Sequence, residues 1–218
     1  MPNRFNFYVL GFVALAGAGL ASSLAAQNAA DWEIGPDVRG RNYSVGMPLQ
    51  PEPARRGGWS FDFPYPNAGV GHVHAVTFDP GPLTNASKIV IRYRVDADRR
   101  VQFAPQETPD QPAVVSLYFQ RRGDNWSGRR QFEFYRWYAP PASVQQIEPG
   151  VYEMSVSFND PNWGSVQGQR VQANPAAFEA ALAQTGRVGI AFGSSGLRSH
   201  GVYSTGRAKF TLLEFRII

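Results

Sequence analysis

The chain has 218 residues, of which 43% are hydrophobic and 17% charged, so it can bury a core and lies outside the composition range of disordered proteins. The absence of cysteine excludes disulfides, thiolate metal ligands and cysteine nucleophiles. The net charge of +4 does not indicate nucleic acid as a partner, because the basic residues are spread along the chain with Asp and Glu between them. The length suits one domain with a short extension.

Residues 1–26 have the features of a cleaved secretory signal peptide. Arg4 gives a positive start, residues 8–20 form an apolar run, and Ser23, Leu24 and Ala25 supply the small-x-small pattern that signal peptidase requires. The alternative is an uncleaved anchor, since residues 7–26 are long enough to cross a bilayer, and this would be the membrane contact of the protein. We expect an exported protein, secreted or periplasmic in a bacterium.

Residues 27–56 change in composition and are predicted to be an extended lead-in with an edge strand near residues 43–47. Residues 57–218 are predicted to form the folded domain. Short runs of alternating apolar residues separated by Gly or Pro predict strands at 58–63, 70–78, 88–95, 100–103, 113–120, 131–138, 151–158, 187–192, 202–205 and 208–217.

A helix is predicted in a single segment, near residues 175–184. Asn174 is a good N-cap, Pro175 suits the first helical position, and Phe178 and Leu182 lie on one face. Many strands with one short helix predict an all-β fold, a two-sheet antiparallel β-sandwich of the jelly-roll type.

The order of motifs after Pro149 resembles the second half of galactose-binding-domain-like jelly rolls, the fold of many carbohydrate-binding modules. A strand over 150–158 leads to a loop bearing Trp163, a short helix follows, and then come the run Gly189-Ile-Ala-Phe-Gly193 and an apolar final strand. The resemblance covers about a third of the chain. It implies a non-catalytic carbohydrate-binding module whose partner is a polysaccharide or glycan; it allows a structural calcium and implies no other cofactor.

Candidate ligand residues come from a predicted hairpin in which 113–120 and 131–138 flank the loop 121–130. Symmetric pairing about the loop places Phe119 opposite Phe132 on the core side, which leaves aromatic and hydrogen-bonding side chains on the other side. Sugars bind to such a mixture of rings and polar groups. The predicted ligand residues are Tyr118, Glu133, Tyr135 and Trp137 on the strands, with Trp126 and Trp163 in loops. Arg136 falls on the core side, where this pairing gives it no partner.

Other interpretations of the same features remain open. In one alternative, both faces of the hairpin are buried. In another, the four arginines of the loop 121–130 around Trp126 bind an anionic polysaccharide. His72, His74 and Asp79 are the metal candidates, with a spacing that faintly resembles the cupins. The corresponding alternatives in function are a metal-dependent enzyme acting on polysaccharide, a lyase using Arg92, His74 and Tyr118, and a structural envelope domain.

Overall fold

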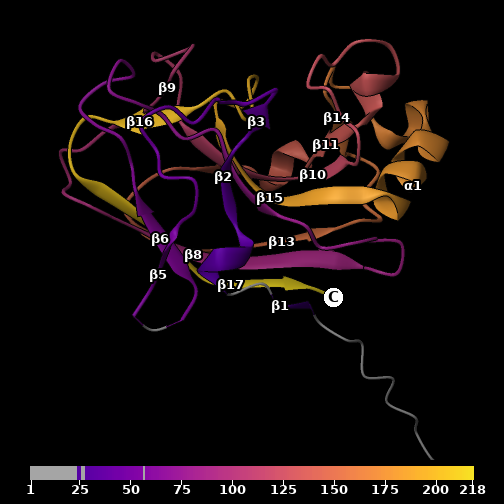
Figure 1. Ribbon diagram of the computed structural model, residues 1–218, viewed down its shortest axis with the longest axis horizontal. Coiled ribbons are helices and arrows are strands. Elements are labelled where there is room, and N and C mark those ends of the chain that lie inside the picture. The colour runs from indigo at the N-terminus through magenta and orange to yellow at the C-terminus, as the bar shows by residue number, and fades with distance from the viewer. Residues whose placement is uncertain (1–23, 26–27, 56) are drawn as a thin grey trace, which may run out of the picture.

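The computed structural model describes residues 24–25, 28–55 and 57–218. Two antiparallel sheets pack face to face, with β8, β13 and β17 in one layer and β10, β11 and β15 in the other (Figure 1). The fold class predicted from the sequence, an all-β two-sheet antiparallel sandwich with one short α-helix among the described residues, is therefore confirmed.

The first sheet, sheet A, has the order β13-β8-β17-β6-β5, with β1 paired to β17. Its strands are β1 (Leu24–Ala25), β5 (Glu52–Pro53), β6 (Trp59–Asp62), β8 (Lys88–Ala97), β13 (Gly150–Ser157) and β17 (Ala208–Ile217). In β8, buried Ile89, Ile91 and Tyr93 alternate with exposed Arg92, as the period of two in the sequence predicts. One face of sheet A is thus core and the other is solvated.

The second sheet, sheet B, has the order β14-β11-β10-β15-β7-β2, with β12 paired to β10. Its strands are β2 (Glu33–Gly35), β7 (Ala75–Phe78), β10 (Val114–Arg121), β11 (Arg136–Tyr138), β12 (Gln145–Gln146), β14 (Gly164–Ser165) and β15 (Thr185–Gly193). Two small ribbons complete the strands, β3 (Asp37–Val38) with β4 (Arg41–Asn42), and β9 (Phe103–Pro105) with β16 (Val202–Ser204).

The core between the sheets is dominated by aromatic rings. Phe61 and Phe192, from opposite sheets, meet edge to face with ring centroids 5.6 Å apart, and Phe210 stacks on Phe61 at 5.3 Å. Aromatic pairs in these geometries add to the free energy of burying their surface.

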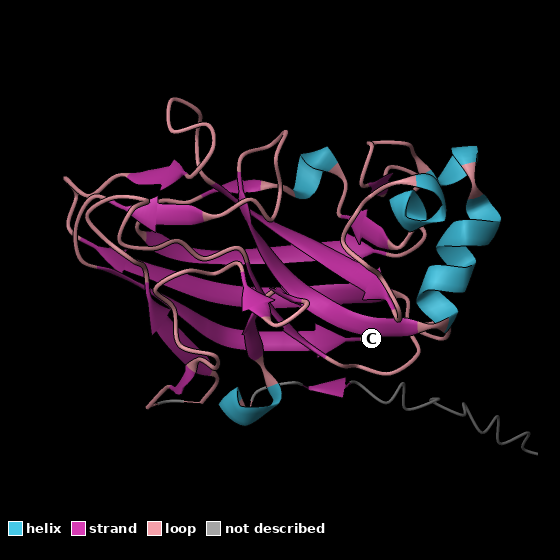
Figure 2. Cartoon of the chain, turned by 45° about the horizontal axis from the view of Figure 1, so that its top comes forward, coloured by secondary structure: helices cyan, strands magenta, loops and turns pink. Residues whose placement is uncertain are grey.

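The helix α1 (Pro175–Ala183) lies at one end of the sandwich (Figure 2). Its N-cap is Asn174, whose side chain accepts a hydrogen bond from the Ala177 N–H, as the sequence predicts. Phe178 then packs against Trp137, with ring centroids 5.0 Å apart, so the helix closes this end of the core. The 3-10 helices are η1 (Ala29–Asp31), η2 (Arg130–Phe134), η3 (Pro141–Ser143) and η4 (Val171–Ala173). No helix in the described residues is long and apolar enough to span a membrane.

The predicted strand 131–138 is wrong over most of its length. Residues 130–134 form η2, and within the predicted strand only β11 pairs with β10. The observed register places Phe119 opposite Trp137 instead of Phe132, so the two sides of this segment are exchanged relative to the prediction. The predicted signal segment lies outside the described residues except for β1, and its cleavage stays a prediction.

Candidate ligand-binding groove

The register of sheet B determines which side chains face away from the core. In β10, Val115, Leu117 and Phe119 belong to the core cluster, so Ser116, Tyr118 and Gln120 lie on the outer face. The partners of these outer residues across the ladders share that face, because directly paired residues point to the same side. They are Arg136 and Tyr138 on β11, Arg187, Gly189 and Ala191 on β15, and Ala75 and Thr77 on β7.

Two tyrosines form the centre of this outer face. The rings of Tyr118 and Tyr138 stack with centroids 5.6 Å apart, and they pack in one cluster with Ala75 and Ala191. Burial raises the pKa of both phenols, so both keep their protons at neutral pH. The small alanine side chains of β7 and β15 leave room for the two rings to lie close to the sheet.

Three adjoining hollows lie over this face, and we call them together the groove. The first, of about 420 Å³, is lined by residues that include Tyr118, Gln120, Asp124 and Trp126. The central one, of about 470 Å³, shares Trp126 with the first. The third, of about 440 Å³, shares Arg136, Tyr138, Arg198 and His200 with the central one. Volumes of this size are typical of ligand sites.

Trp126 lies between the first two hollows, and contacts with Asp124 and Arg136 hold it in place. Its backbone has a left-handed φ of 63°, and its N–H donates to Asp124 Oδ1 at 3.0 Å. The Arg136 guanidinium lies under the indole, 4.3 Å from the ring centroid, and Arg136 Nε is 2.7 Å from Asp124 Oδ2. Gln120 Nε2 donates to the same oxygen at 3.0 Å. The indole is therefore held on the wall of the groove while remaining partly exposed.

The carboxylate under Trp126 is almost wholly enclosed. The side chains of Arg136 and Asp124 are 7% and 0% exposed. Burial raises the pKa of Asp124, and the charge of Arg136 opposes that rise. This pair also gives Arg136 the acidic partner that the predicted pairing lacked, because the residue faces outward and not into the core.

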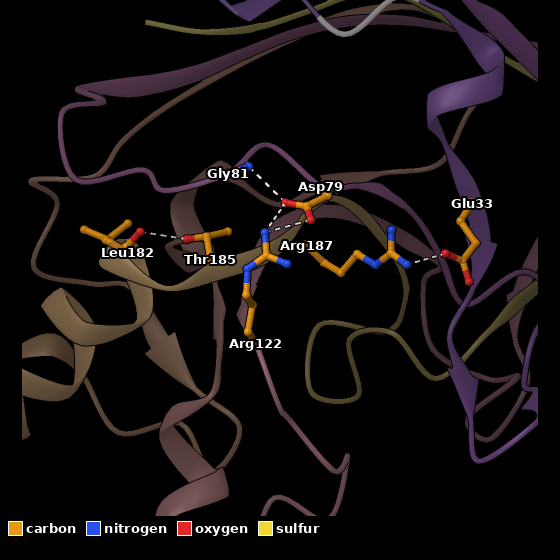
Figure 3. Close-up of polar contacts among 7 residues, drawn as sticks. All are labelled: Glu33, Asp79, Gly81, Arg122, Leu182, Thr185 and Arg187. Atoms are coloured by element: carbon orange, nitrogen blue, oxygen red, sulfur yellow. Dashed lines mark hydrogen bonds and ion pairs between the residues drawn. The ribbon is translucent and has the colours of Figure 1, made fainter.

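Two exposed ion pairs stand at the rim of the first hollow (Figure 3). Arg122 reaches across to Asp79, with Nη2 2.8 Å from each carboxylate oxygen, and Arg187 of β15 reaches Glu33 of β2 at 2.5 Å. Asp79 also accepts a hydrogen bond from the Gly81 N–H at 2.9 Å. Two of the three described arginines that line this hollow are thus already paired with acids.

The central hollow contains a second accessible ring. Tyr43, from the segment between β4 and β5, is 39% exposed and lines this hollow together with Trp126 and Tyr138. Its ring meets His74 with centroids 6.2 Å apart. Burial lowers the pKa of His74 to about 4, and Nδ1 lies 2.8 Å from the Ser199 carbonyl, so the imidazole is neutral and donates there at pH 7.

The structure separates the six predicted ligand residues. Tyr118 and Trp126 line the groove, but Trp126 is partly exposed whereas Tyr118 is only 1% exposed and forms the floor. Trp137 and Trp163 are 0% exposed: Trp137 faces the core because of the observed register, and Trp163 packs against Phe158 with centroids 5.7 Å apart. The predicted ligand-binding face of the hairpin that included Trp137 is therefore absent, and Trp163 is not available to a ligand as a loop residue.

Glu133 and Tyr135 lie outside the groove. Glu133 belongs to η2, and its carboxylate accepts a bond from Ser165 Oγ at 3.5 Å. Tyr135 lies under Arg121, whose guanidinium is 4.7 Å from the ring centroid. These two residues were predicted to face the ligand beside Trp137, and the same register error accounts for their misplacement.

The metal candidates are not brought together. His72 and His74 have ring centroids 4.9 Å apart, but the Asp79 carboxylate is bound to Arg122. In the described part of the chain, no group of three or more His, Cys, Asp or Glu residues is placed to hold a metal ion. A structural calcium stays a prediction.

The residues named for a lyase lie on different sheets. Arg92 is exposed on sheet A, whereas Tyr118 lies on the outer face of sheet B. Because the core of the sandwich separates these surfaces, Arg92 and Tyr118 do not share a site.

Several groove residues were missed by the sequence reasoning, among them Tyr43, Tyr138, Arg170, Arg198 and His200. They come from separate loops and strands and form no local motif. The signal that could have found one of them, Tyr138, is the unexplained Arg136: if Arg136 faces outward, Tyr138 two positions along the strand faces outward as well.

These features define a β-sandwich domain with an aromatic and arginine-lined groove on one sheet face. No protein-family model matches the chain, and neither does any curated protein. One similar solved structure is a carbohydrate-binding module, CBM28, described as specific for non-crystalline cellulose. The two chains are 14% identical, the match covers 88% of each, and the TM-score is 0.44, a value too low to carry an argument about this chain.

Proposed function

We propose that the protein binds a glycan chain, without catalysing a reaction on it, in the groove on the outer face of sheet B. One observation carries this proposal: Trp126 and Tyr43, two partly exposed rings from distant segments, line the same hollow among hydrogen-bonding side chains. The C–H face of a pyranose packs on such rings, while polar neighbours bond its hydroxyls.

The extended shape of the groove supports binding of a chain of sugars rather than of a single sugar. The hollows adjoin one another through shared residues, with Trp126 between the first and the second and Tyr138 between the second and the third. Arg136 is held in place by Asp124, so the ring above it is preorganised for stacking. Export belongs to the same proposal and is supported by the sequence of residues 1–26.

Affinity electrophoresis in gels containing soluble polysaccharides tests the proposal. We expect at least one polysaccharide to retard the wild type, and Trp126→Ala and Tyr43→Ala each to weaken that binding by about tenfold, equivalent to about 1.4 kcal/mol. Trp126→Phe should keep part of the binding because it keeps a ring. Tyr65→Ala is the matched control, since Tyr65 is a similarly exposed ring that lines none of the three hollows.

Circular dichroism would establish that each variant is folded. Equal retardation of the wild type, Trp126→Ala and Tyr43→Ala would place any glycan binding elsewhere. Release of new reducing ends from a bound polysaccharide would show that the protein is an enzyme and overturn the non-catalytic part.

A further inference from the structure

The third hollow of the groove has an unusual balance of charge. Arg136, Arg170 and Arg198 line it together with His200, and no aspartate or glutamate within the described ranges does so. We call it the arginine hollow. Only one of its arginines has its charge neutralised nearby, since Arg136 is paired with the buried Asp124.

Arg170 and Arg198 are anchored by neutral groups. Nη1 of Arg170 donates to the Asn162 carbonyl at 2.7 Å, and Nη1 of Arg198 donates to the Ala139 carbonyl. None of the ion pairs found between described residues includes either of them. A guanidinium has five N–H donors, so each of these side chains is held in position with donors to spare.

The position of Arg198 is electrostatically unfavourable without an anion. Burial lowers the pKa of Arg198 and the neighbouring charge of Arg170 also lowers it, whereas Tyr138 raises it. The remaining histidine of this hollow, His200, has Nδ1 3.0 Å from Glu107 Oε1, so Glu107 is directed to the imidazole. A bound anion would relieve the repulsion between the two guanidinium groups.

The arginines of the loop 121–130 do not provide guanidinium groups in a hollow that lacks acids, as Arg170 and Arg198 do. Arg121 donates to the neutral Gln184 Oε1 at 3.0 and 2.9 Å but lines the first hollow, which also contains acids, and Arg122 is paired with Asp79. Arg129 and Arg130 are exposed and line none of the three hollows. Both hollows that residues of this loop line also contain acids, and the anionic grip that the loop's sequence suggests stays a prediction.

We propose that the arginine hollow binds the carboxylate of an acidic sugar, and that the glycan held in the groove contains uronic acid residues. This inference rests on the proposed function. The planar guanidinium fork matches a carboxylate with two parallel hydrogen bonds. The hollow shares Tyr138 and Arg198 with the central hollow, so a chain stacked on Trp126 continues directly toward the two arginines.

Isothermal titration calorimetry with two matched probes tests this inference: a hexasaccharide of galacturonic acid, and the same hexasaccharide with its carboxyl groups reduced to alcohols. We expect the wild type to bind the acidic probe about tenfold or more tightly than the neutral one, as charge-assisted pairs require. The difference should shrink at high sodium chloride concentration, because salt screens the added attraction.

Arg198→Gln and Arg170→Gln should each remove most of the preference for the acidic probe, so that the ratio of acidic-probe to neutral-probe affinity falls from about tenfold toward one. Arg92→Gln is the control, since it removes the same charge from the exposed face of sheet A. Arg198→Gln removes the hydrogen-bond donor to the Ala139 carbonyl and could prevent folding. In that case, Arg170→Gln and the comparison of the two probes on the wild type still decide whether the hollow binds a carboxylate.

The outcomes separate the two proposals. Equal binding of both probes by the wild type and by Arg170→Gln would overturn the acidic-sugar inference and leave glycan binding in place. Equal loss of acidic-probe affinity in Arg92→Gln would reveal general charge attraction and would also overturn the inference. If neither these probes nor any polysaccharide in the gel assay binds the wild type, glycan binding and the inference both fail.

Discussion

Substituting Arg136 with methionine would test the polar support beneath Trp126. The change keeps much of the aliphatic stem but leaves the Asp124 carboxylate, which is 0% exposed, without its cation at 2.7 Å. Breaking one side of a buried pair costs about 3–5 kcal/mol. Asp124 keeps the hydrogen bonds from the Gln120 side chain and the Trp126 N–H, so we expect a loss of about 3 kcal/mol in the free energy of unfolding.

The control is Arg122→Met, which breaks an ion pair of nearly equal length at 2.8 Å whose side chains are 57% and 42% exposed. Its cost should be about 0–1 kcal/mol because water already solvates both charges. Urea denaturation followed by tryptophan fluorescence measures both variants. The double variant Arg136→Met/Asp124→Asn should recover part of the loss, since it removes the stranded charge as well.

The pH dependence of the same variant gives a second check. Burial already raises the pKa of Asp124, and removing Arg136 raises it further. The folded state then binds the proton more tightly than the unfolded state, so the variant loses stability as pH rises through the folded pKa. The cost of Arg136→Met should therefore be largest at neutral pH and shrink on acidification. A cost below 1 kcal/mol at pH 7, equal to that of Arg122→Met, would refute this account of the pair.

Three further predictions concern stability. Gly189→Ala should cost about 1–3 kcal/mol in urea denaturation, because a Cβ there would lie 2.2 Å from the Val76 carbonyl oxygen, whereas Gly196→Ala, which meets nothing within 4 Å, should cost far less. The pKa of His74 is lowered from 6.5 to about 4, so the unfolded state binds more protons between these values, and stability should fall as pH drops through this range, by roughly 3 kcal/mol at most. Removing residues 1–25 should cost about 1 kcal/mol or less in thermal unfolding, because the described part of this segment, β1, pairs with β17 through just Leu24 and Ala25.

Each of these has a clear contrary result. Equal midpoints of urea denaturation for Gly189→Ala and Gly196→Ala would mean that β15 and β7 move apart to accommodate the added Cβ at no cost in stability. An unchanged slope of stability against pH in His74→Asn would assign the acid sensitivity to another group. Failure of the shortened chain to fold would show that β1 is needed for the sandwich.

The fold was largely predictable because its signals are local. The alternation of Ile89, Ile91 and Tyr93 defines a strand with one buried face, and Asn174 with Pro175 defines the start of the helix. Both patterns arise from neighbouring residues on one element. They required no knowledge of which strands pair.

The site was less predictable because it depends on pairing. The apolar residues Phe132 and Phe134 satisfied a strand pattern, yet they belong to the 3-10 helix η2. Pairing Phe119 with Trp137 instead of Phe132 reversed every side chain in β11 relative to the expectation. Arg136 conflicted with the predicted register, and this conflict correctly indicated that the register was wrong. Tyr43 and Arg198, which reach the groove from distant loops, gave no sequence signal.

The strict alternation along β10 has an evolutionary consequence. Leu117 and Phe119 point into the core, while Ser116, Tyr118 and Gln120 point to the groove face. One strand therefore carries two independent sets of constraints at every second position. Relatives of this protein can exchange the outward set to suit a different ligand while the inward set, and with it the packing of the sandwich, stays the same.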